Sequence, residues 1–226
     1  MLSISKRLEK IAGLVPKGSR VADIGADHGY LSVFLIKQNI SSLVYACDIR
    51  EKPLLNAKRN ITAAAAENIE LRLCNGLDGI NESEIDTAVI AGMGGEVIAG
   101  IIDRCGWIKN PRYTLVLQPM TSGEELRKYL FLNGFNIETE SAVEDEGRIY
   151  TVLSVKYSGE FFPFTEKDLY IGKLNPKNST DLKYISKQLN RLKKCRDDIK
   201  NISAKQAEFM RLEQAITEIT EFIGGK

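Results

Sequence analysis

Short apolar runs alternate with amphipathic stretches along the first 133 residues of the chain. The runs end at Gly, Asp, Asn or Pro positions and indicate strands, whereas the stretches between them repeat apolar residues at helical spacing. The expected strands cover residues 20–25, 43–48, 69–74, 87–91 and 113–118. The expected helices cover residues 5–14, 30–38, 52–66, 96–104 and 122–133. This alternation predicts an α/β fold whose parallel sheet is covered by helices on both faces.

Two further strands follow with no helix between them. Residues 135–143 and 148–157 have strand character and are joined by a turn at 144–147, so they form an antiparallel hairpin. Parallel sheets bind ligands at the carboxyl ends of their strands, and the turn should lie at that edge, with Arg148 and Tyr150 facing the pocket mouth. A parallel sheet that ends in a hairpin resembles the class I (Rossmann-like) methyltransferases, whereas a nicotinamide-binding domain would continue with strand–helix–strand units.

The last part of the chain has a different pattern. After an apolar segment at 161–164 and a loop at 172–176, apolar residues recur every three or four positions in two stretches. Their positions are Leu182, Ile185, Leu189, Leu192 and Ile199, and then Phe209, Leu212, Ile216, Ile219 and Ile223. This spacing predicts a coiled-coil-like helical hairpin within one chain, although such heptads could also pair between chains. We therefore expect a catalytic domain at 1–159, a helical module at 160–226 and a monomer.

Composition limits the class of protein. No apolar run reaches membrane-spanning length, and charges alternate too early in the chain for a signal peptide. The four cysteines are far apart, without a Cys-x-x-Cys pair, and there is one histidine. We expect a cytoplasmic protein with reduced thiols, no metal site and no membrane contact.

Charge is unevenly distributed, although the net charge is only +1. Residues 179–200 contain seven Lys or Arg and three Asp. Such a helix could contact the phosphates of a nucleic acid. From charge alone, a solvated helix face is the simpler interpretation.

The stretch Val21–Tyr30 carries the strongest chemical signal. An apolar strand breaks into the turn Gly25-x-Asp27-x-Gly29, which opens a helix and lets a ligand approach bare backbone. Asp48 ends the next strand, where an acid can accept hydrogen bonds from both hydroxyls of a ribose. Together these features predict a site for an adenosine-containing cofactor.

The turn favours S-adenosylmethionine over a dinucleotide. Asp27 stands where dinucleotide sites place the glycine that approaches the pyrophosphate, and its carboxylate would repel phosphate. Asp27 and Asp23 could instead pair with the cationic amino group of a methionine moiety. Asn75 and Gly76, after the third strand, could recognise the adenine edge.

The fourth strand ends in Ala91-Gly92-Met93-Gly94-Gly95. At this strand end, methyltransferases place the residues that face the transferred methyl group. The Asn-Pro-Pro-Tyr sequence of many amino-directed enzymes is absent. The glycines leave room for a flat base beside Met93. For Gly94 and Gly95 alone, close packing at a helix start explains the residues nearly as well.

Several of these motifs together resemble the bacterial tRNA (adenine-22-N1)-methyltransferase family, TrmK. The resemblance rests on Arg7-Leu8 with Ile11-Ala12, Leu14-Val15-Pro16, Val21–Gly25, Asp27-His28-Gly29-Tyr30-Leu31, Ala91–Gly95 and Leu117-Gln118-Pro119. It implies S-adenosylmethionine-dependent methylation of N1 of adenine 22 in the D-arm of tRNA. From the residues alone, a methyltransferase of small molecules or proteins and a non-enzymatic RNA-binding protein remain open.

Adenine N1 has an in-plane lone pair and can attack a sulfonium methyl in line without a general base, so no side-chain base is assigned. The target base must leave its stack to react. His28 could act as a base, but its place in the turn favours orienting the cofactor. For Tyr30 and Tyr150 the alternative is core packing, and for Arg7 it is a surface salt bridge.

The candidate residues fall into two sets. The candidate cofactor-binding residues are Arg7, Asp23, Gly25, Asp27, His28, Gly29, Asp48, Ile49, Asn75, Gly76, Leu77, Ala91, Gly92 and Met93. The candidate substrate-binding residues are Tyr30, Met93, Gly94, Gln118, Pro119, Arg148, Tyr150, Lys183, Lys187, Arg191 and Lys194.

Overall fold

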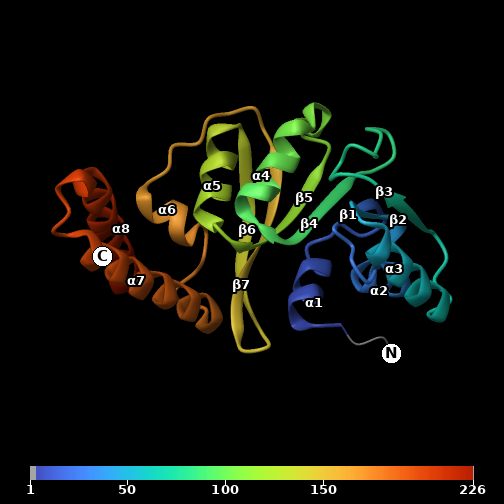
Figure 1. Ribbon diagram of the computed structural model, residues 1–226, viewed down its shortest axis with the longest axis horizontal. Helices are drawn as coiled ribbons and strands as arrows, with labels where there is room; N and C mark the ends of the chain where they lie inside the picture. The colour runs from blue at the N-terminus through green and yellow to red at the C-terminus, as the bar shows by residue number, and fades with distance from the viewer. Residues whose placement is uncertain (1–3, 226) are drawn as a thin grey trace.

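The computed structural model describes residues 4–225 as a seven-stranded sheet between two layers of helices, with a helical tail at one end (Figure 1). The strands are β1 Ser19–Ile24, β2 Ser41–Asp48, β3 Ile69–Leu73, β4 Thr87–Gly94, β5 Thr114–Thr121, β6 Phe135–Asp145 and β7 Arg148–Tyr157. The α-helices are α1 Lys6–Ala12, α2 Tyr30–Lys37, α3 Glu51–Ala63, α4 Gly95–Arg104, α5 Gly123–Leu132, α6 Glu166–Ile171, α7 Ser179–Ile199 and α8 Gln206–Gly224. Short 3₁₀ turns at Gly106–Ile108 and Ser203–Lys205 complete the elements.

The strand order is β3-β2-β1-β4-β5-β7-β6. The pairs from β3 to β5 are parallel, and β7 is antiparallel to both β5 and β6. The predicted sheet and hairpin are therefore confirmed. The chain order reverses between β1 and β4, so the carboxyl ends of these two strands form the crevice in which such sheets bind ligands.

Helices cover both faces of the sheet, and the side chains of each strand point alternately to one face and the other. In β1, Ala22 and Ile24 pack against α4 and α5, whereas Val21 packs against α1 and α2 on the opposite face. Asp23, next along the strand, points to the same face as Val21. Strands buried on both sides read as nearly continuous apolar runs, which is why they stand out in the sequence.

Strands β4, β5 and β6 run beyond their predicted ends. β4 continues to Gly94 and β5 to Thr121, and their pairing shifts register around Gly92. Gly92 has φ 78°, a left-handed conformation that glycine adopts easily. The resulting bulge lies beside the crevice, a position where bulges are common in binding sites.

The tail forms the predicted helical hairpin, and it packs on the sheet. Its apolar core joins α6, α7 and α8 to Ala142 and Ile149 of the β6–β7 hairpin. Arg196, which interrupts the apolar spacing of α7, reaches Glu213 of α8 at 2.7 Å. The short helix α6 was missed by the sequence pattern. The division at residue 159 stays a prediction.

Candidate functional site

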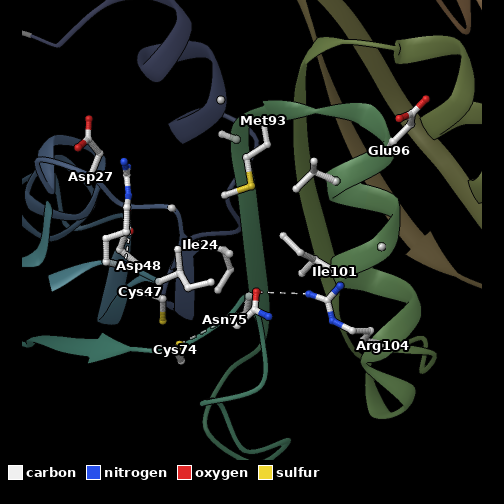
Figure 2. Close-up of a pocket in the computed structure, with 18 residues that line it drawn as sticks. Ile24, Asp27, Cys47, Asp48, Cys74, Asn75, Met93, Glu96, Ile101 and Arg104 are labelled. Carbon is white, nitrogen blue, oxygen red and sulfur yellow. Dashed lines mark hydrogen bonds and ion pairs between the residues drawn. The ribbon is translucent and has the colours of Figure 1, made fainter.

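Two neighbouring cavities lie at the carboxyl ends of β1 and β4. The larger, of about 670 Å³, lies between the ends of β1, β2 and the β3 loop on one side and α4 on the other (Figure 2). The second, of about 270 Å³, lies on the α1 and α2 side and includes Arg7, Asp23 and Tyr30. Gly25, Asp27, Ala91 and Gly92 line both, so the two cavities form one cleft over the strand ends.

The Gly25–Gly29 turn adopts the conformation that its sequence predicts. Gly25, Asp27 and Gly29 have φ values of 76°, 47° and 70°, and aspartate is one of the few residues that tolerate this region. A Cβ atom on Gly25 would overlap the terminal methyl of Met93, whose side chain extends from β4 toward Ile24 (Figure 2). Met93 therefore lies in the larger cavity, against the Gly25 turn.

Asp48 and Asn75, two of the predicted cofactor-binding residues, line the larger cavity. Asp48 is buried at the end of β2 and accepts a hydrogen bond from the backbone N–H of Arg50 at 2.9 Å. Asn75 follows β3, and its Oδ1 accepts from Arg104 of α4 at 3.5 Å (Figure 2). A carboxylate and an amide at two ends of one cavity can hold a ribose and a purine ring.

Asp23 is buried in the second cavity, and its carboxylate accepts from the Ser32 hydroxyl at 2.6 Å. Burial raises the pKa of Asp23 to about 6, although the hydrogen bond from Ser32 opposes the shift. Arg7 lines the same cavity and is held by a 2.7 Å hydrogen bond to Gln118. An acid and a guanidinium in one cavity suit the amino and carboxylate groups of a zwitterionic amino acid.

Asp23 is predicted to pair with the ammonium group of the cofactor, and its raised pKa then predicts that cofactor affinity depends on pH. Only the ionised carboxylate pairs with an ammonium group, so the Kd for S-adenosylhomocysteine should rise about tenfold per pH unit below pH 6 and level off above it. Calorimetry between pH 5 and 8 measures this. Asp23→Asn should bind weakly at every pH, without that slope. An unchanged slope in Asp23→Asn would exclude Asp23 as its source.

One face of α4 contributes residues that the sequence did not single out. Glu96, Gly100 and Arg104 recur every four positions and line the larger cavity together with Ile101. Their helical spacing was visible, but which face of α4 meets the cavity depends on how the helix packs. Cys47 and Cys74 also line this cavity, and the neighbouring Cys47 thiol lowers the pKa of Cys74 to about 7.

A third cavity, of about 200 Å³, lies between the ends of β5 and β7 and helix α7. It brings together the predicted substrate residues Pro119, Tyr150, Lys187 and Arg191. Met120 lines both this cavity and the second one, so the third cavity adjoins the cofactor cleft.

Other candidates occupy different positions. Gln118 is fully buried, and its Oε1 accepts from Arg7 and from the Gly92 N–H, so it braces β4, β5 and α1. Tyr30 is exposed and stacks on His28 with ring centroids 5.5 Å apart. Trp107 packs against Tyr113. The candidates that line none of the three cavities are Gly29, Leu77, Gly94, Gln118, Arg148, Lys183 and Lys194.

Two basic residues of α7 pair with acids of β6 and α5. Lys183 pairs with Glu144 at 2.8 Å, and Arg191 pairs with Glu124 at 2.9 Å. Within residues 4–225, no helix has the length and apolarity to cross a membrane, and no three His, Cys, Asp or Glu side chains are grouped to hold a metal ion.

Comparisons with known proteins agree with this geometry. Residues 4–153 match the family model described as a methyltransferase domain. The chain is 34% identical over 153 residues to the tRNA (adenine(22)-N(1))-methyltransferase of Bacillus subtilis, and the alignment covers 67% of this chain and 64% of that protein. The chain thus matches less than two thirds of that relative's length.

Solved structures extend the similarity to the tail. The crystal structure of the B. subtilis M1A22 tRNA methyltransferase TrmK has a TM-score of 0.86 and 27% identity, covering 99% of this chain and 100% of that one. M. capricolum TrmK, solved with the cofactor product S-adenosylhomocysteine, has a TM-score of 0.79 and 25% identity, covering 98% of each chain.

Proposed function

Because the chain belongs to the methyltransferase-domain family and, within it, to the bacterial tRNA (adenine-22-N1)-methyltransferases, we propose that it methylates N1 of adenine 22 in the D-arm of tRNA. S-adenosylmethionine is the methyl donor. The observation that carries this proposal is the continuous cleft that joins Asp48, Asp23 and Arg7 across the ends of β1 and β4. The same cleft ends at Met120, beside a cavity that reaches the basic helix α7.

The residues present fit the donor. Asp48 would accept from the ribose hydroxyls, and Asn75 would contact the adenine edge at the far end of the larger cavity. Asp23 and Arg7 would hold the amino and carboxylate groups in the second cavity. When bound, S-adenosylmethionine supplies an electrophilic methyl group on a sulfonium.

The protein contributes to the chemistry by positioning the target base against the methyl group. Adenine N1 presents its lone pair without losing a proton, so the site has to hold the base in line with the methyl group and exclude water. Gly92, at the bulge in β4, lines both cavities of the cleft. Gln118 fixes that bulge by accepting from the Gly92 N–H at 3.1 Å.

The tail supports tRNA as the substrate. Beyond the Arg191–Glu124 ion pair, α7 carries further basic residues, of which Lys194 is exposed. We propose that residues 160–226 contact tRNA and that the protein acts in the cytoplasm, where tRNA is modified. The monomeric state remains a prediction.

Methyl transfer from labelled S-adenosylmethionine to bulk bacterial tRNA tests the proposal. We expect label in tRNA, with a KM that rises steeply as salt increases from 50 to 200 mM, because phosphate contacts release counterions. Donor binding without label in tRNA would contradict the proposal and point to a substrate that is not RNA.

A further inference from the structure

The third cavity adjoins the cofactor cleft, and the proposed function assigns no ligand to it. Met120 separates it from the second cavity, and the Tyr150 ring lies on its border. Arg7, on the cofactor side, has its guanidinium carbon 5.8 Å from the centroid of that ring. A group in the third cavity would therefore lie one side chain away from the cofactor cleft.

The walls of this cavity suit a nucleotide. Pro119, Ile149 and Tyr150 offer apolar and aromatic surface, while Thr121 and Gln188 offer polar groups. Purine bases need this combination, because their faces stack on aromatic rings and their edges form hydrogen bonds. The cavity, at about 200 Å³, has room for one base.

Helix α7 supplies the wall opposite β7, and its charges indicate where a phosphate would lie. Arg191 is partly neutralised by Glu124 at 2.9 Å. Lys187, one turn earlier on α7, is exposed at the rim of the cavity and forms no ion pair with any described residue. Its ammonium group can reach a phosphate outside the cavity while the base lies inside.

We propose that the third cavity receives the nucleotide extruded from tRNA for methylation, with its base against Tyr150, its N1 edge directed past Met120 toward the cofactor cleft, and a phosphate on Lys187. This inference rests on the proposed function and adds a role for the tail. Helix α7 then completes the nucleotide pocket as well as contacting the surface of tRNA.

The rate of a single turnover separates this role from general attraction to tRNA. A residue that touches the nucleotide only after extrusion lowers the rate even when tRNA saturates the enzyme, whereas a general phosphate contact changes only the affinity. Lys187→Ala should reduce the single-turnover rate about tenfold at saturating tRNA and cofactor. Lys187→Arg should restore most of that rate.

Two further variants complete the test. Lys193→Ala removes an equal charge from another face of α7, outside the cavity, and should leave the saturated rate within about twofold of wild type. Gln188→Trp fills the cavity from α7 and should reduce the rate about a hundredfold, with unchanged affinity for S-adenosylhomocysteine.

The outcomes distinguish the two proposals. If the wild-type protein does not methylate tRNA, the proposed function fails. If it does, but Lys187→Ala and Lys193→Ala have the same saturated rate, the third cavity is not the nucleotide pocket. A slower Lys187→Ala with wild-type cofactor affinity and thermal midpoint supports the assignment.

Discussion

Replacing Asp48 with alanine should raise the Kd for S-adenosylmethionine and S-adenosylhomocysteine about a hundredfold or more. The buried carboxylate can accept two hydrogen bonds from a ribose, and charged acceptors of this kind contribute about 1.5–3 kcal/mol each. Isothermal calorimetry measures the change. Asp48→Asn, which keeps the shape and one acceptor oxygen, should have an intermediate Kd.

Asp78 offers a matched control for Asp48. It is exposed in the loop after β3 and lies outside the larger cavity. Asp78→Ala removes the same charge near the site and should leave the Kd within about twofold. Equal losses in both variants would mean that Asp48 acts through the general field of the site and does not bind the ribose.

Arg127→Ala should lower the free energy of unfolding by about 3–5 kcal/mol, the largest stability loss we expect from one substitution. The Arg127 and Glu140 side chains are 1% and 0% exposed, and the Arg127 Nε donates to Glu140 at 3.1 Å. Removing the guanidinium leaves a carboxylate buried without its counter-charge. Urea unfolding, followed by circular dichroism, measures the change.

The double variant Arg127→Met, Glu140→Leu tests this explanation. Apolar side chains of similar volume remove both charges together, so the double variant should recover more than half of the loss. If it is as unstable as Arg127→Ala, the cause is lost packing or the lost hydrogen bond to the Leu169 carbonyl, and not the buried charge.

The Arg127–Glu140 ion pair also determines which variants can test whether the tail contacts tRNA. Arg127 donates to the Leu169 carbonyl at 2.9 Å, and the backbone N–H of Lys173 donates to Glu140 at 3.1 Å. Truncation near residue 159 would remove both contacts and expose the apolar surface around Ala142. Point variants on α7 therefore separate tRNA contact from folding better than truncation does.

The parts of the site that follow directly from strand ends could be predicted from the sequence. Asp23 and Asp48 interrupt or close apolar runs, and acids at those points indicate a ligand site. The glycine turn was equally visible, because Gly25 and Gly29 need positive φ. These signals are local, and tertiary packing does not change them.

Features that depend on tertiary packing were missed or misplaced. Gln118 precedes a proline and looks like a strand end, but β5 continues to Thr121 and buries it. Arg104 reaches Asn75 across 29 positions, and Arg191 reaches Glu124 across 67. Neither spacing nor composition indicates such long-range pairs.

The most direct test of the central claim is the position of the methyl group in tRNA. Purified protein, S-adenosylmethionine and a transcript with adenine at position 22 should yield N1-methyladenosine at that position by nuclease digestion and mass spectrometry. A transcript that differs only by guanine at position 22 should yield none. Equal methylation of both transcripts, or methylation at another base, would contradict the account.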